Sequence, residues 1–107
     1  MNGYKIRRVT TSGNVYADLS DEYILCRHSS GTVNIMLGIP SNFTGKCIRI
    51  KSVGKDVNVY AGTSTSNASY YIVRSNGSQI YGIETDDNAC RSYWSDGTYW
   101  YEEFMGW

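Results

Sequence analysis

YILCRHSSGTVNIMLGIPSNFTGKCIRIKSVGKDVNVY, residues 23–60, carries the clearest structural signal in this chain. Four segments in this stretch alternate apolar and polar side chains with a period of two, and short turns rich in Gly, Ser, Asn and Asp separate them. Such alternation is typical of β-strands, because successive side chains on a strand point to opposite faces. Pro40 ends the second segment, since proline fixes φ and has no backbone N–H to give to a sheet. The stretch therefore predicts four short strands and no helix.

The flanking sequence has the same character. Turn signals such as Asn76-Gly77 and Asp96-Gly97 separate further strand-like segments. Because no exact repeat is found, no solenoid is expected. We predict an all-β fold, a small β-sandwich or β-prism of about ten short antiparallel strands, in a single β domain over residues 1–107 with residues 1–4 as a flexible N-terminus. The expected strands are residues 5–10, 14–19, 22–28, 32–37, 46–53, 56–61, 70–75, 79–84, 89–94 and 98–104.

The charge balance limits the choice of partners. Ten basic and ten acidic side chains give a formal net charge of zero, and the longest basic run is Arg7-Arg8. Nucleic acid is not an expected partner, because phosphate binding needs a concentrated positive surface. No segment approaches the roughly 20 apolar residues of a membrane span, and the first residues lack an apolar signal-peptide core. We expect a soluble protein that is neither inserted into a membrane nor exported by the Sec pathway.

Cys26, Cys47 and Cys90 are widely spaced, form no C-x-x-C pair and share the chain with a single histidine, His28. An odd count argues against a disulfide framework, and zinc sites need clustered Cys and His ligands. We therefore expect three free thiols that pack within strands, with no metal and no cofactor. This expectation suits assembly in a reducing cytoplasm.

Candidate catalytic groups are few. Cys26 and His28 point to the same face of one expected strand, but a single histidine within a strand serves packing or surface roles far more often than catalysis. The acidic pairs 86–87 and 102–103 consist of neighbours in sequence, and on a strand such side chains diverge instead of converging across a glycosidic bond. We expect these pairs to be a turn and a solvated strand, and we expect no enzymatic activity.

A series of short motifs runs through nearly the whole chain, from Val9 to Glu103. In order, the motifs are Val9-Thr10, Asp21, Tyr23-Ile24-Leu25, Val33-Asn34-Ile35-Met36-Leu37, Pro40, Gly45, Ile48-Arg49-Ile50-Lys51 and Ser95-Asp96-Gly97-Thr98-Tyr99-Trp100-Tyr101. This order resembles that of small β-rich modules in bacteriophage tail fibres, tail spikes and capsid head fibres. The chain departs from their pattern at Leu37-Gly38-Ile39-Pro40, where the family usually has Leu and Pro adjacent, and this leaves the end of that strand open.

The resemblance implies a homotrimeric virion appendage whose chains pack β-sheets about a common axis, beside other virion proteins. The segment 22–28 supports a trimer, because it is apolar on both faces and must be packed against other residues on both sides. A chain of 107 residues has few residues for this, and neighbouring chains would supply more. Ile24, Leu25, Val33 and Ile35 are the candidate trimer core. The expected location is the virion, assembled in the bacterial cytoplasm, with capsid and tail both left open.

Aromatic residues are the main candidates for binding. Ten Tyr and three Trp are present, and exposed Tyr and Trp stack on sugar rings and anchor interfaces, although aromatic residues also fill strand cores. Trp94 and Tyr99 flank the turn at residues 95–97, and with Asp96 and Asn67 they are the candidate contacts to a bacterial surface glycan or receptor. Two functions stay open: a non-enzymatic structural and host-attachment domain of a phage fibre, and a stand-alone lectin-like carbohydrate-binding module.

Overall fold

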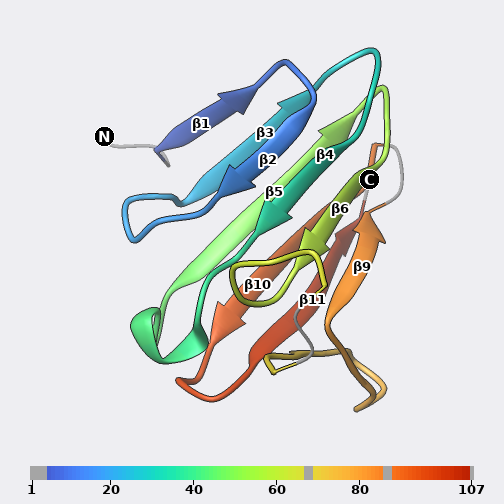
Figure 1. Ribbon diagram of the computed structural model, residues 1–107. Helices are drawn as coiled ribbons and strands as arrows, with labels where there is room; N and C mark the ends of the chain where they lie inside the picture. The colour runs from blue at the N-terminus through green and yellow to red at the C-terminus, as the bar shows by residue number, and fades with distance from the viewer. Residues whose placement is uncertain (1–4, 67–68, 86–87, 107) are drawn as a thin grey trace.

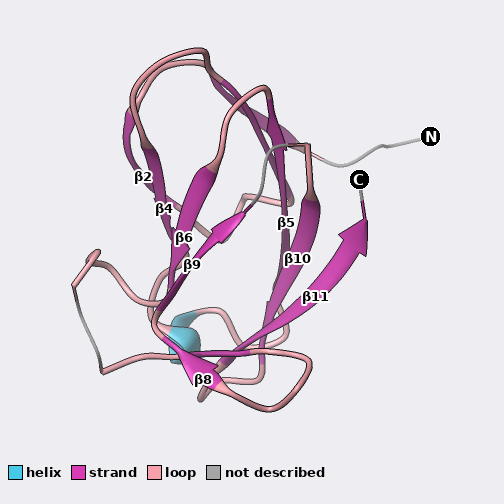
Figure 2. Ribbon diagram, turned by 90° about the vertical axis from the view of Figure 1, so that its right-hand side faces the viewer, coloured by secondary structure: helices cyan, strands magenta, loops and turns pink. Residues whose placement is uncertain are grey.

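The computed structural model describes residues 5–66, 69–85 and 88–106, with side chains described as far as residue 103. This part of the chain forms strands in two sheets that face each other across the core, and contains no α-helix (Figure 1; Figure 2). The elements are β1 (Ile6–Val9), β2 (Gly13–Tyr16), β3 (Tyr23–Arg27), β4 (Val33–Met36), the 3-10 turn η1 (Pro40–Asn42), β5 (Cys47–Val53), β6 (Val57–Tyr60), β7 (Ile72–Val73), β8 (Gln79–Ile80), β9 (Gly82–Thr85), β10 (Cys90–Ser95) and β11 (Trp100–Gly106). Within these described ranges, no helix has the length and apolarity needed to cross a bilayer.

The first half of the chain is a short solenoid. Strands β1 to β6 alternate between a seven-stranded sheet of order β1-β3-β5-β10-β11-β7-β8 (sheet A) and a four-stranded sheet of order β2-β4-β6-β9 (sheet B). The neighbours β1, β3 and β5 pair in parallel, and so do β2, β4 and β6. Each odd-even strand pair is therefore one coil, stacked on the next. The expected all-β class is confirmed, but the antiparallel sandwich or prism and the absence of a solenoid were wrong.

Unequal coil lengths explain why the repeat is not visible in the sequence. Ile6 lies opposite Tyr23, 17 positions later, whereas Tyr23 lies opposite Arg49, 26 positions later. Much of the difference comes from the loop with η1, which follows the break at Pro40. Parallel strands need a crossover connection, and here the opposite sheet supplies it. A period-two pattern identifies each strand but not the partner with which it pairs.

The parallel stack ends where the chain reverses. Strand β9 pairs antiparallel with β6, and β10 pairs antiparallel with β5. The hairpin of β10 and β11 then extends sheet A, followed by β7 and β8. The expected strand over residues 79–84 divides at Tyr81, because β8 belongs to sheet A and β9 to sheet B. The chain therefore crosses between the sheets at this residue.

The core lies between the two sheets and belongs to the single chain. Ile24 of β3 lies opposite Ile50 of β5, and Ile35 of β4 lies opposite Val59 of β6, with all four side chains fully buried. Burial at these stacked positions supplies the main stabilisation, at about 25 cal/mol for each Å² of apolar surface removed from water. Three members of the candidate trimer core, Ile24, Val33 and Ile35, are thus covered within one protomer, whereas Leu25 is half-buried.

An ion pair covers the core at the first coil. Arg7 of β1 lies opposite the inward-facing Ile24, and its guanidinium binds both carboxylate oxygens of Asp21, at 3.1 and 2.8 Å. Asp21 is 3% exposed and also accepts a hydrogen bond from the backbone N–H of Asp18. Such a bidentate pair satisfies the buried carboxylate while the arginine stem covers apolar side chains.

Candidate functional site

The hairpin of β10 and β11 brings three aromatic side chains together on the outer face of sheet A. Trp94 lies directly opposite Tyr101, and their rings stack with centroids 4.6 Å apart and planes 20° apart. Tyr99 meets Tyr101 edge-on, with centroids 6.4 Å apart. Trp94 is 38% exposed, so the cluster presents aromatic surface to solvent. We call Trp94, Tyr99 and Tyr101 the aromatic platform.

Asp96 fixes the platform through the turn. Its Oδ1 accepts the backbone N–H groups of Thr98 and Tyr99 at 2.8 and 2.9 Å, and its Oδ2 accepts the phenol of Tyr101 at 2.9 Å. The backbone N–H of Tyr99, followed by that of Thr98, holds the pKa of Asp96 below 3.8. The same carboxylate raises the pKa of the Tyr101 phenol by accepting its proton in a hydrogen bond. Both oxygens of Asp96 are therefore engaged in holding the turn and one ring.

The structure brings together three of the four residues that the sequence proposed as receptor contacts. Trp94, Tyr99 and Asp96 lie together, because a tight hairpin turn places its flanking residues next to each other. Tyr101 completes the cluster, and its position opposite Trp94 follows from the register of the same hairpin. Asn67, the fourth candidate, lies outside the described residues.

Cys26 and His28 do not form an activated pair. Cys26 is fully buried, and this burial raises the pKa of its thiol to about 12. A nucleophilic cysteine needs the opposite shift, because the thiolate is the reactive form. The His28 ring is 5% exposed, and neither of its nitrogens has a hydrogen-bond partner among the described residues. Cys26, Cys47 and Cys90 are all free thiols.

One of the two acidic residues expected on a solvated strand is buried. Glu102 is 7% exposed, and its carboxylate pairs with Arg91 at 2.9 Å and with Arg74 at 3.4 Å. The phenol of Tyr93 donates to the same carboxylate at 3.4 Å. The expectation was wrong for Glu102 and correct for Glu103, which is exposed. Two separate segments, β10 and the turn after β7, supply these partners, so no local sequence signal could have identified the network.

The described ranges contain no group of three or more His, Cys, Asp or Glu side chains that could hold a metal ion. The arrangement of the platform is suited instead to contact with another molecule through aromatic surface. Comparisons of the chain with protein-family models, with curated proteins and with solved structures found no match.

Proposed function

We propose that this protein is a non-enzymatic structural and host-attachment domain of a bacteriophage virion fibre, in the tail or on the capsid. The observation that carries the proposal is the aromatic platform, in which Trp94 is exposed and Asp96 fixes the turn and the Tyr101 ring. Rigid aromatic side chains give a large contact area at a low cost in conformational entropy. The resemblance of the motif order to that of phage fibre modules supports the proposal of a virion setting.

In this proposal the platform contacts a bacterial surface glycan or receptor. Trp94 and Tyr99 supply the stacking surface, and Asp96 acts mainly by holding the turn. Asn67, which lies outside the described residues, remains a proposed hydrogen-bonding partner. The buried Cys26 thiol is compatible with assembly in the reducing cytoplasm of a bacterial host.

We further propose that the domain works as a homotrimer beside other virion proteins. Exposed hydrophobic side chains support association. Among the described residues, three of the five exposed large hydrophobic residues belong to the first coil and the segment after it: Ile6, Tyr16 and Leu19. Strands β1 and β2 are also sheet edges with unpaired backbone groups. The buried Ile24, Val33 and Ile35 would then form the core next to the interface, and the half-buried Leu25 would contact the neighbouring chain directly.

A stand-alone lectin-like module is the second candidate. The observation in its favour is the self-contained core, in which Ile24, Ile35 and their partners are fully buried within one chain. A protomer with such a core does not need a neighbour in order to fold. In this case the aromatic platform would serve the same binding role in a monomer.

Light scattering and binding measurements test these proposals together. In size-exclusion chromatography with light scattering, a fibre domain should have three times the 12.0 kDa mass of the chain. A lectin-like module should have the mass of a monomer. The double variant Trp94→Ala, Tyr99→Ala should lose binding to host cells or to a glycan array while keeping its oligomeric state. Thr98→Ala is the matched control, because Thr98 is exposed on the same turn outside the platform. Unchanged binding by the double variant would exclude the platform as the attachment site.

A further inference from the structure

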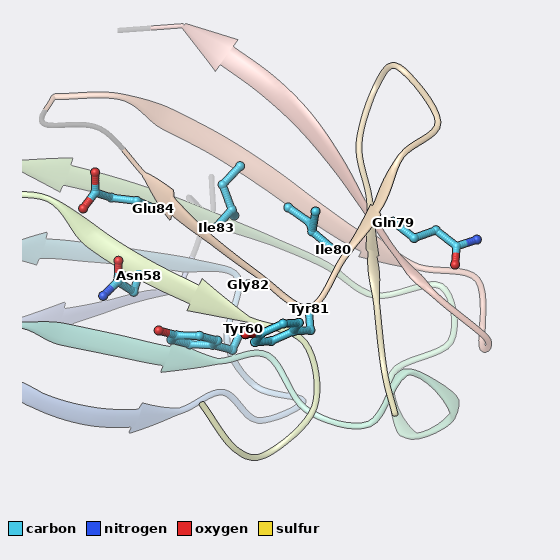
Figure 3. Close-up of a pocket in the computed structure, with 8 residues that line it drawn as sticks. All are labelled: Asn58, Tyr60, Gln79, Ile80, Tyr81, Gly82, Ile83 and Glu84. Atoms are coloured by element: carbon cyan, nitrogen blue, oxygen red, sulfur yellow. The ribbon is translucent and has the colours of Figure 1, made fainter. Parts of the chain in front are cut away.

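The outer face of sheet B carries a hollow of about 430 Å³ that lies away from the aromatic platform. Its lining comes from β6, β8 and β9, and Figure 3 shows the side chains of these strands around it. Tyr60 and Tyr81 contribute two aromatic rings, and Asn58 and Glu84 contribute polar groups. Gln79, also in the lining, extends away from the other labelled side chains (Figure 3).

A glycine shapes the floor of this hollow. Gly82 of β9 lies directly opposite Tyr60 of β6, and a Cβ at Gly82 would be only 2.5 Å from Cδ1 of the tyrosine ring. The missing side chain therefore allows the ring to lie against the backbone of β9. Tyr81, the preceding residue, is 45% exposed. The two rings form an aromatic surface that any larger residue at position 82 would displace.

Hydrogen bonds between three asparagines on neighbouring strands orient the amide of Asn58 in the hollow. Asn58 donates its Nδ2 to Oδ1 of Asn34 at 3.2 Å, and Asn34 donates in turn to Oδ1 of Asn14 at 3.1 Å. The amide of Asn58 is thus fixed with its nitrogen toward β4, which leaves its own oxygen on the side of β9. Glu84 lies opposite Asn58 in the register and is exposed.

Three polar groups around the hollow, unlike Asn58, lack a hydrogen-bond partner among the described residues. Within the described residues, the hydroxyls of Tyr60 and Tyr81 and the carboxylate of Glu84 make no hydrogen bond, in contrast to Tyr101 and Asp96 on the platform. Two aromatic rings beside a fixed amide and a free carboxylate match the chemistry of a sugar, with C–H faces that stack and hydroxyls that donate and accept.

We infer that this hollow is a saccharide-binding site, separate from the aromatic platform and independent of whether the protein belongs to a virion. The charge of the lining narrows the ligand class. Among the described residues, Glu84 is the only charged residue that lines the hollow, so a neutral sugar or an amino sugar is favoured and a uronic acid is repelled. In the bound state the ring of the sugar stacks on Tyr60 and Tyr81, and Asn58 and Glu84 hydrogen-bond its hydroxyls.

Amide chemical-shift mapping by NMR tests the inference, with methyl glucoside, methyl galactoside, N-acetylglucosamine, glucosamine and glucuronate as separate probes. At least one neutral or amino sugar should shift the amides of residues 58–60 and 81–84, and glucuronate should bind more weakly than glucosamine. Tyr81→Ala should weaken binding at least about tenfold. Gly82→Ala should also weaken it, because the added methyl group displaces the Tyr60 ring.

Tyr16→Ala is the matched control for Tyr81→Ala. Tyr16 lies in the same row as Tyr60 but on β2, two strands away, and is 55% exposed. Its loss should leave the sugar-induced shifts of residues 58–60 and 81–84 unchanged. Glu84→Gln should remove the preference for glucosamine over glucuronate, because it removes the charge of the lining. The inference is overturned if no probe shifts these amides, if the shifts map to another face, or if Tyr81→Ala binds as well as the unmodified protein.

Discussion

The indole N–H of Trp100 donates a buried hydrogen bond of 2.8 Å to the carbonyl oxygen of Gly38, 62 residues earlier in the chain. Trp100 opens β11 of sheet A, whereas Gly38 follows β4 of sheet B, so this bond ties the two sheets together at one end. Gly38 has a φ of +109°, and the ring of Phe43 occupies the space that its Cβ would need. The Phe43 ring in turn packs against Trp100, with centroids 5.3 Å apart.

Replacing Trp100 with Phe should therefore destabilise the protein by about 2–4 kcal/mol, because it leaves the Gly38 carbonyl unsatisfied and opens a cavity. Urea unfolding with an unchanged m-value would measure this loss. Tyr99→Phe, at the neighbouring half-buried position, is the control and should change the free energy of unfolding far less. A midpoint for Trp100→Phe equal to that of the control would contradict the role of this bond.

Glu102→Ala should cost about 3–5 kcal/mol, because it leaves the guanidinium of Arg91 largely buried without its carboxylate. Glu103→Ala is a closely matched control, since the neighbouring side chain is exposed and its removal should change stability by about 0.5 kcal/mol or less. Thermal and urea unfolding of both variants would measure the difference. Equal stability of the two would show that the buried ion pairs contribute nothing.

Cys26 should resist thiol reagents in the native protein, because burial both blocks access and raises its pKa to about 12. Cys47 and Cys90 are half-buried and should react first. Mass spectrometry after brief alkylation at pH 8 should therefore find Cys26 unmodified, and three thiols per chain should react once the protein is unfolded without reductant. Fewer thiols under these conditions would reveal a disulfide.

Asp96 should titrate below 3.8 in the folded protein, because backbone N–H groups stabilise its charged form. A folded pKa that is lower than the unfolded one gives a stabilisation that is present above about pH 3.8 and is lost as the pH falls through the folded value. The carboxyl carbon shift of Asp96, followed by NMR during acid titration, measures this directly. The Trp94 and Tyr101 resonances should move in the same pH range, and an Asp96 pKa of 3.8 or higher would refute the proposed hydrogen bonding.

The strands and the aromatic hairpin could be predicted because their signals are local. The alternation of apolar and polar side chains predicts β5. The Asp-Gly turn places Trp94 beside Tyr101 independently of the rest of the chain. The solenoid could not be predicted in the same way, because pairing β3 with β5 depends on a crossover of variable length. Glu102 was assigned to solvent for a related reason, since Arg74 lies 28 residues away on another element.

The hollow on sheet B was equally hidden in the sequence. Gly82 in a strand pattern indicates a close approach, but only the register of β6 and β9 shows that Tyr60 is the residue that approaches. The hydrogen bonds between the three asparagines have the same origin. Asn14, Asn34 and Asn58 are separated by unequal distances along the chain and meet only because successive coils stack in parallel.

Because the chain reverses after β6, coils can be added to this fold at one end only. Antiparallel strands close the coil that contains β5 and β6, whereas β1 and β2 both remain edges of their sheets at the opposite end. An additional coil could therefore be inserted beside the first without disturbing the hairpin or the hollow. The new coil would need its own ion pair, equivalent to Arg7–Asp21, to cover the core at its end. The number of coils can change at one end of this architecture while the aromatic platform and the hollow stay unchanged.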